Sequence, residues 1–227
     1  MVLGQRQRSV MVVEENVRVL VLGATGGVGR LVVEKALQHG HQVTALVRSP
    51  EKLGDIASRI RVVQGDALDP DGVGAAVAGQ DAVIYTLGTG PGLVRHTTFF
   101  SNSTRVLLTA MSLHSVRRLI CVTGVGAGET KGHGGFLYDR IFFPLFTKAI
   151  YADKDRQESL IRQSQTDSTI VRPAAFLKHR REETLRVVTN VEGVTLRRIT
   201  REEVAQFLLD ELEHNRYVHQ SVFIGHE

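Results

Sequence analysis

The fold of this chain is decided by the stretch Val17-Arg-Val-Leu-Val-Leu-Gly23-Ala-Thr-Gly26-Gly27-Val-Gly29-Arg30. Its first part is apolar, its middle is rich in glycine, and residues 31–37 follow with apolar side chains at helical spacing. A strand, a tight turn and a helix in this order form the context in which such glycines indicate a dinucleotide site. A strand-to-helix turn that binds no ligand is the simpler alternative.

Each glycine of this loop has a distinct physical task in a dinucleotide site. Gly23 can adopt turn angles that side chains resist. Gly26 leaves room for a pyrophosphate, and Gly29 lets the helix pack closely on the strand. The unpaired N–H groups and partial positive charge of the helix N-terminus stabilise a phosphate. The spacing is Gly-x-x-Gly-x-x-Gly, not Gly-x-Gly-x-x-Gly. The predicted cofactor contacts of the loop are Gly23, Thr25, Gly26, Gly27, Val28 and Gly29.

Size and composition predict one globular domain. The chain has 227 residues, of which 42% are hydrophobic and 23% are charged, as in ordinary soluble proteins. The net charge of +4 is spread without a long Lys/Arg block, so we expect no nucleic-acid partner. No apolar run reaches the ~18 residues of a membrane span, so we expect no membrane partner. The single Cys121 excludes an internal disulfide framework and fits a reducing, cytoplasmic compartment.

Residues 1–15 are interpreted as an N-terminal extension before the domain of residues 16–227. Residues 4–8 are polar, and residues 10–13 are apolar but too few for the hydrophobic region of a signal peptide. We expect a flexible arm or an extra contact at a sheet edge, without a targeting role.

Strands and helices alternate along the rest of the chain. Short segments rich in β-forming residues predict strands at 41–47, 60–63, 81–86, 118–123 and 168–172. Apolar residues at helical spacing predict helices at 69–77, 96–114, 152–163 and 201–214. This alternation implies a parallel sheet covered on both faces. Right-handed crossovers then give a single-domain, doubly wound α/β fold of the Rossmann type.

The residue after the second predicted strand favours NADP(H) as the cofactor. Ligands of this fold lie over the carboxyl ends of the strands, where an acid after the second strand binds the ribose hydroxyls of NAD. This chain has Arg48 there instead. A guanidinium matches a 2′-phosphate in charge and geometry, and Lys52 can assist it. An exposed arginine without a ligand is the alternative.

Residues after the other strands complete the predicted cofactor site. Asp66 can accept a hydrogen bond from an adenine amino group, although a turn or capping role is the alternative and Asp69 competes for the cap. Gly88 lets the chain pass close to the nicotinamide ribose, and Thr123 follows the strand where catalytic hydroxyls of this architecture stand. The remaining predicted cofactor contacts are Ala67, Leu87, Thr89, Lys154, Pro173 and Ala174.

Together these motifs resemble the NAD(P)H-binding branch of the short-chain dehydrogenase/reductase superfamily in its atypical form, which includes the NmrA-like and biliverdin-IXβ reductase/flavin reductase groups. The resemblance extends from Val17 to Gly225. It rests on Gly23–Gly29, Leu46-Val-Arg48, Gly65-Asp66, residues 77–83, Leu87-Gly88-Thr89 and Ile170-Val-Arg-Pro173. It implies the fold and the cofactor more specifically than the substrate.

The predicted catalytic residues are Thr123, Tyr151 and Lys154. Typical members of the superfamily use Tyr-x-x-x-Lys, in which the Tyr protonates a carbonyl and the Lys lowers its pKa and holds the ribose. This chain has Tyr151-Ala-Asp-Lys154, one residue closer, and alignment on Glu158 puts Ile150 at the Tyr position. Either an irregular helix start lets Tyr151 reach the site, or solvent supplies the proton, as the biliverdin-IXβ reductase resemblance implies. Thr123 can orient a carbonyl; purely structural roles for Thr123 and Tyr151 are the alternative.

Residues 128–150 form a predicted insert on the substrate side. Its apolar side chains are Phe136, Leu137, Tyr138, Ile141, Phe142, Phe143, Leu145 and Phe146. They indicate either a lid over a flat aromatic substrate, or a core helix or subunit contact. His133 and Asp139 have no further ligands at suitable spacing, so no metal site is predicted.

Two functions follow as hypotheses. The first is an NADP(H)-dependent oxidoreductase that transfers a hydride to a small conjugated or carbonyl acceptor, such as a flavin, quinone, tetrapyrrole, aldehyde or ketone. The second is a non-catalytic NADP(H)-binding redox sensor of the NmrA type that acts through a protein partner. A sugar-nucleotide epimerase is disfavoured by the short C-terminal region. We expect a monomer or a homodimer.

Overall fold

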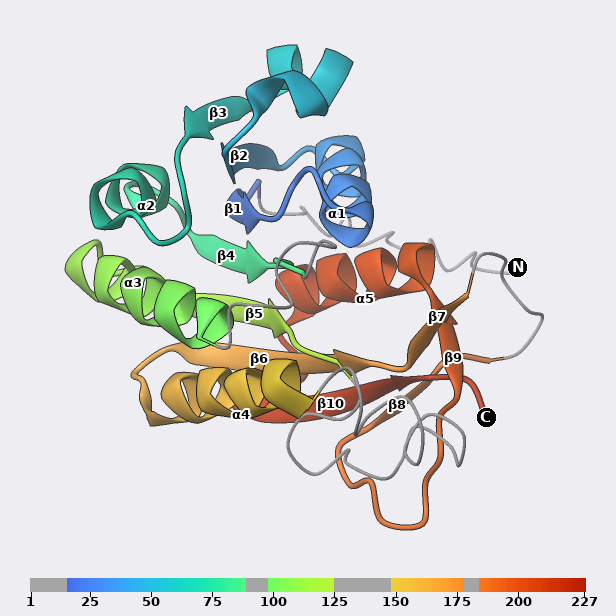
Figure 1. Ribbon diagram of the computed structural model, residues 1–227. Coiled ribbons are helices and arrows are strands. Elements are labelled where there is room, and N and C mark those ends of the chain that lie inside the picture. Colours follow the sequence, from blue (N-terminus) through green and yellow to red (C-terminus); the bar gives the residue numbers. More distant parts are fainter. Residues whose placement is uncertain (1–15, 89–97, 125–147, 178–183) are drawn as a thin grey trace, which may run out of the picture.

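The computed structural model describes residues 16–88, 98–124, 148–177 and 184–227. An eight-stranded sheet, in the order β3-β2-β1-β4-β5-β6-β10-β8, runs through the molecule (Figure 1). A separate two-stranded sheet pairs β7 with β9. The strands are β1 (Arg18–Leu22), β2 (Gln42–Val47), β3 (Arg61–Gln64), β4 (Ala82–Tyr85), β5 (Arg118–Val122), β6 (Asp167–Pro173), β7 (Ala175–Leu177), β8 (Arg186–Val188), β9 (Arg198–Thr200) and β10 (Gln220–Gly225). The helices are α1 (Gly27–Gln38), α2 (Pro70–Val77), α3 (Phe99–Leu113), α4 (Lys148–Gln163) and α5 (Arg201–His214), with a 3-10 segment η1 (Pro50–Arg59).

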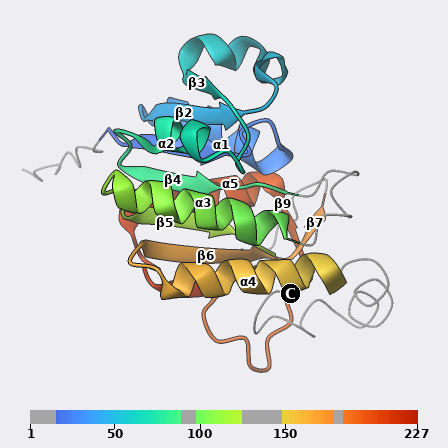
Figure 2. The same cartoon turned by 60° about the vertical axis from the view of Figure 1, so that its left-hand side comes forward.

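Helices cover both faces of the large sheet. α1 and α5 pack side by side on one face, and α2, α3 and α4 cover the other (Figures 1 and 2). Strand β1 shows why: Val19 and Val21 belong to the core under α1 and α5, whereas Leu20 and Leu22 belong to the core under α2, α3 and α4. Because successive side chains of a strand point to opposite faces, a strand buried on both sides is apolar throughout. The predicted doubly wound α/β fold is therefore confirmed.

The sheet is not parallel throughout, which corrects the prediction at one edge. β8 pairs antiparallel with β10 and ends the sheet, while the pairs from β3 to β10 are parallel. The strands β7 to β10 and the segment η1 were not predicted. Residues 1–15, the predicted extension, and nearly all of the predicted insert lie outside the described residues. Within the described residues, no helix has the length and apolar character needed to cross a membrane.

The loop between β1 and α1 is packed so tightly that two of its glycines leave no room for a side chain. Gly23 has a φ of +93°, which favours glycine. A Cβ on Gly29 would lie 2.2 Å from the Gly23 carbonyl oxygen and 2.6 Å from Thr86 Oγ1. Thr86 is itself fixed, because its N–H and its hydroxyl both donate to the Leu22 carbonyl at 2.8 Å. The first turn of α1 is thereby held against the carboxyl ends of β1 and β4.

This packing predicts that Gly29→Ala is strongly destabilising. The added methyl group would meet backbone atoms that cannot move without separating α1 from β1, so we expect the free energy of unfolding to fall by about 3 kcal/mol or more. The matched control is Gly74→Ala in α2, where the nearest atom to a new Cβ is His114 Nε2 at 3.9 Å. That variant should be unchanged or up to ~1 kcal/mol more stable, since alanine favours a helix interior. Urea unfolding of both variants tests the prediction, and equal stabilities would contradict it.

Candidate functional site

The carboxyl ends of β1, β4 and β5 lie next to one another in the sheet and carry the residues of the candidate site. Gly23 follows β1, Thr86 follows β4 and Thr123 follows β5. The first turn of α1 lies at the same edge, because the helix begins four residues after Gly23. The fold thus brings together loop segments that are up to a hundred residues apart in sequence.

The first turn of α1 has the features of an anion site. Gly26 is its N-cap, no side chain caps the turn, and the turn contains no acidic residue. Within the described residues, the N–H groups of Gly27, Val28 and Gly29 have no hydrogen-bond acceptor. The starts of α2, α3 and α5 do have one. Asp69 caps α2, Thr200 and Glu203 form a capping box at α5, and Asp153 accepts from the N–H groups of Phe100 and Ser101 in α3. A phosphate group fits the uncapped N–H groups of α1 in both charge and geometry.

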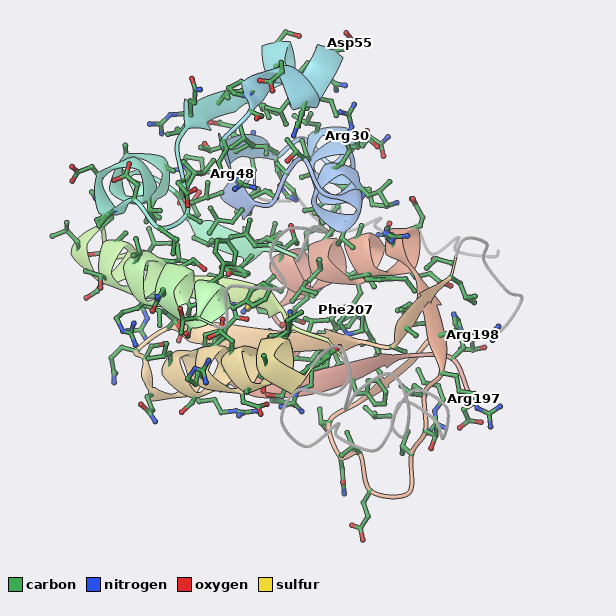
Figure 3. All side chains as sticks on the ribbon, viewed as in Figure 1. Arg30, Arg48, Asp55, Arg197, Arg198 and Phe207 are labelled. Carbon is green, nitrogen blue, oxygen red and sulfur yellow. The ribbon has the colours of Figure 1, made fainter. Side chains whose placement is uncertain are left out.

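Arg48 and Lys52 are exposed at the carboxyl end of β2 and just beyond it. Figure 3 shows Arg48 at the end of β2. The neighbouring segment η1 is tied to α1, because Arg30 Nη1 donates to the Leu53 carbonyl at 2.9 Å. Within the described residues, Arg48 and Lys52 form no ion pair, so both cations are available to a ligand phosphate.

Asp66 and Asp69 divide the turn and capping roles that the sequence left open. Asp69 accepts from the N–H groups of Asp71 and Gly72 and caps α2. Asp66 Oδ1 accepts from the Leu68 N–H at 2.9 Å within its own turn. The second oxygen of Asp66 makes no hydrogen bond within the described residues. Ala67 is nearly buried beside it.

The other predicted cofactor contacts differ in how accessible they are. Gly88 is exposed, with no atom of the described residues within 4 Å of a Cβ built on it, and Leu87 is half-buried. Pro173 and Ala174 are buried, and the Ala174 N–H donates to the Ile224 carbonyl, so Ala174 packs against β10. Thr89 lies outside the described residues.

Behind the edge lies a buried ionic network centred on Glu158 of α4. Its carboxylate accepts from Arg172 Nε at 3.0 Å and Arg172 Nη2 at 2.6 Å, and from the Thr123 hydroxyl at 2.8 Å. The Glu158 and Arg172 side chains are 0% and 2% exposed. A buried ion pair of this kind is tolerated only where further hydrogen bonds satisfy it. The Thr123 hydroxyl proton is engaged in this network; its predicted role of orienting a carbonyl stays a prediction.

Lys154 stands beside this network. Its Nζ donates to the Thr123 carbonyl at 2.6 Å and lies 4.4 Å from the centre of the Phe100 ring. Burial lowers the pKa of Lys154 to about 8, although Cys121, Glu158 and Asp153 act in the opposite direction. The same burial raises the pKa of the Cys121 thiol. Lys154 is therefore an amine whose charge changes near neutral pH, held at the carboxyl end of β5.

Tyr151 reaches the same place. Helix α4 begins at residue 148, four residues before the predicted start, so Tyr151 lies inside the helix. A Cβ built on Gly124 would be 3.7 Å from the Tyr151 hydroxyl oxygen. Residues three apart share one face of a helix, so Tyr151 and Lys154 both point to the end of β5. Ile150, at the aligned Tyr position, packs instead against the core under α2, α3 and α4.

The sequence analysis missed the contacts of two arginines at this site. It placed Arg172 in the predicted strand 168–172 without a partner, yet a charged residue inside an otherwise apolar strand is a signal for a buried partner. The contact of Arg201 with the glycine-rich loop was not predicted either; a Cβ on Gly27 would lie 2.8 Å from Arg201 Cδ. The one signal for it is an arginine in the first turn of a helix, where the helix dipole disfavours cations.

The uncapped first turn of α1 and the pair of Tyr151 and Lys154 lie at the same edge of the sheet. This combination is typical of dinucleotide-binding proteins of the Rossmann type. The NAD(P)H-binding family matches residues 23–215. The chain therefore belongs to that family, and solved structures with the same fold include a short-chain dehydrogenase/reductase of Veillonella parvula and the oxidoreductase ylbE of Lactococcus lactis.

The relatives and solved structures agree with this assignment. The uncharacterized protein YwnB of Bacillus subtilis is 27% identical over 207 residues, covering 86% of this chain and 91% of YwnB. Two of the first curated relatives are much longer, and the chain spans only 12% and 27% of their lengths. A short-chain dehydrogenase/reductase from Veillonella parvula in complex with NADP has a TM-score of 0.77 at 17% identity, over 92% of this chain and 94% of that one. The anaerobillin reductase ChuY of Escherichia coli O157:H7 has a TM-score of 0.75 at 23% identity, over 92% and 96%.

The lowered pKa of Lys154 predicts a pH dependence of stability. The native state releases the Lys154 proton near pH 8, whereas the unfolded chain keeps it up to its ordinary pKa of 10.5. The contribution of Lys154 to stability is therefore lowest below pH 8 and rises as the pH passes from 8 to 10.5. Between these values, the free energy of unfolding of the wild type minus that of Lys154→Met should rise by about 1–3 kcal/mol. Urea unfolding of both proteins measures this difference. Groups that titrate alike in both proteins do not contribute to it. A difference that stays flat over this range would contradict the burial of a titrating amine.

Proposed function

We propose that this protein is an NADP(H)-dependent oxidoreductase that reduces a small conjugated or carbonyl acceptor. One observation carries the proposal. The Tyr151 hydroxyl and the Lys154 amine come from one face of α4 to the carboxyl end of β5. This strand lies two positions from β1, whose loop offers the phosphate site. A proton donor and a cation thus stand at the edge where the fold receives a dinucleotide.

Each residue of the site has a task in this proposal. NADPH, when bound, supplies a hydride, so an acceptor that gains it also needs one proton. Tyr151 is the proposed donor of that proton, and Lys154 favours the ionised phenol by its positive charge. The Thr123 carbonyl fixes the Lys154 amine, while the Thr123 hydroxyl is held by Glu158. Thr123 therefore acts as a positioning residue in this proposal.

The acceptor class is proposed from the fold and from one neighbour. Within the described residues, a Cβ built on Gly88 at this sheet edge would meet no atom within 4 Å, which suits an extended, flat molecule better than a small one. The solved neighbour ChuY is described as an anaerobillin reductase, and its chain is covered almost completely by the comparison. Linear tetrapyrroles, flavins and quinones are therefore the first acceptors to test, with aldehydes and ketones as the second group.

The oxidoreductase proposal predicts NADPH oxidation that depends on Tyr151. Purified protein with NADPH should oxidise it in the presence of at least one acceptor from these groups, followed by the absorbance of reduced nicotinamide. With a carbonyl or tetrapyrrole acceptor, Tyr151→Phe should lower kcat by about 10²-fold or more, because a general acid is lost. The matched control is Tyr217→Phe, since Tyr217 packs against Phe207 beyond the C-terminal end of α5.

An unchanged kcat in the Tyr151→Phe variant would contradict the role of Tyr151 and would indicate that solvent donates the proton. Tight NADPH binding without turnover of any acceptor would favour the redox-sensor hypothesis.

The preference for NADP(H) over NAD(H) has its own test at Arg48. A guanidinium at the end of β2 binds a 2′-phosphate but has no special partner in NADH. Arg48→Ala should therefore weaken NADPH binding about tenfold or more and NADH binding much less, as measured by calorimetry. Arg59→Ala, which removes an exposed arginine at the end of η1, is the control for net charge. Equal weakening of both cofactors would contradict the 2′-phosphate assignment.

A further inference from the structure

The side chain of Arg201 lies across the first residue of α1. A Cβ built on Gly27 would lie 2.8 Å from Arg201 Cδ, 2.9 Å from Nε and 3.8 Å from Cζ. Only a residue without a side chain leaves Arg201 in this position. Arg201 is the first residue of α5, which packs beside α1 on one face of the sheet (Figures 1 and 2). The guanidinium therefore reaches the glycine-rich loop from the last helix of the chain.

The electrostatic surroundings of Arg201 are unfavourable for a cation, and within the described residues its guanidinium has no counter-ion. It stands in the first turn of α5, where the helix dipole disfavours a cation, and beside the uncapped N-terminus of α1, which adds a like partial charge. Within the described part of the chain, its side chain has no ion pair or hydrogen bond; Arg118 and Arg172, by contrast, pair with Glu211 and Glu158. Its guanidinium carbon lies 4.8 Å from the centre of the half-exposed Phe176 ring. An aromatic ring holds the group in place without neutralising it.

We propose that Arg201 binds the pyrophosphate of the dinucleotide, together with the N–H groups of the first turn of α1. This inference rests on the proposed function, because it places a dinucleotide on the glycine-rich loop. A guanidinium presents a planar fork of N–H donors that matches two phosphate oxygens. Phe176 orients this fork before the ligand arrives, which lowers the entropy lost on binding. Gly27 provides the space in which the Arg201 side chain crosses α1.

The two exposed arginines then recognise different phosphates. Arg48 directly follows β2, whereas Arg201 begins α5, the helix that packs against α1. Arg201 recognises the pyrophosphate, which NADPH and NADH share. Arg48 recognises the 2′-phosphate, which only NADPH carries. Loss of Arg201 should thus weaken binding without changing the preference between the two cofactors.

The test is equilibrium binding of NADPH and of adenosine 2′-monophosphate, which has no pyrophosphate, measured by calorimetry or by competition. Arg201→Ala should weaken NADPH binding by about 10- to 100-fold and leave the binding of adenosine 2′-monophosphate within about twofold, since charge-assisted hydrogen bonds to the pyrophosphate alone are lost. Arg201→Lys keeps the charge but not the fork, and should give a smaller loss. The melting temperature without ligand should stay within ~2 °C, because the side chain is exposed.

The matched control is Arg197→Ala, which removes the same charge four residues earlier. Figure 3 shows Arg197 and Arg198 at the outer margin of the molecule beside β9. The assignment would be overturned if Arg201→Ala bound NADPH as tightly as Arg197→Ala does. It would also be overturned if Arg201→Ala lost the same affinity for NADPH and for adenosine 2′-monophosphate. A wild-type protein that binds no dinucleotide would overturn both proposals. One that binds NADPH but reduces no acceptor would overturn the oxidoreductase proposal alone, and the comparison of the arginine variants would still decide the role of Arg201.

Discussion

Glu158 holds a carboxylate in the interior between β5 and β6, and the geometry of the candidate catalytic residues follows from it. Burying a carboxylate and a guanidinium removes both from water, and the loss of either partner typically costs ~3–5 kcal/mol. Arg172 supplies two hydrogen bonds and Thr123 a third. Because Thr123 is fixed in this way at the end of β5, its carbonyl holds the Lys154 amine. The network therefore acts on the candidate site by fixing the position of Thr123 and, through it, of Lys154.

Helix α4 has a buried polar face whose hydrogen bonds fix the neighbouring elements α3, β5 and β6. Asp153 accepts from the first N–H groups of α3, and Gln157 donates to Thr104 in the middle of that helix. Lys154 and Glu158 act on β5 and β6. A face of this kind cannot slide along its neighbours, since each polar group would lose a partner that the interior does not replace. α3 thus has its N-terminus satisfied by the protein, whereas the first N–H groups of α1 have no acceptor within the described residues.

The sequence predicted the elements that have strong local signals and missed those that depend on distant partners. The β1–α1 junction and α5, with its 201–214 bounds, agree with the structure because glycines, apolar periodicity and a capping box mark them locally. Strands β7, β8 and β9 have three residues each, too few for an alternating pattern to show. The direction of the Thr123 hydroxyl depends on Glu158, 35 residues later. The contact of Arg201 with Gly27 depends on the packing of two helices from opposite ends of the chain, and an arginine in the first turn of a helix marks the residue locally but not its partner.

The short spacing of Tyr151 and Lys154 moves the phenol around the helix without removing it from the site. At about 100° per residue, a side chain three positions before Lys154 lies ~60° to one side of it, and one four positions before lies ~40° to the other. Because α4 begins at residue 148, Tyr151 comes to the end of β5 from within the helix, and its role as the proton donor stays a prediction. The consequence is that the Tyr151 hydroxyl lies over Gly124, whose φ of +136° favours a residue without a side chain. In the proposed reduction, Tyr151 and Lys154 therefore act at the end of β5 from two sides of one helix face, and the acceptor approaches between that strand and Gly88 at the end of β4.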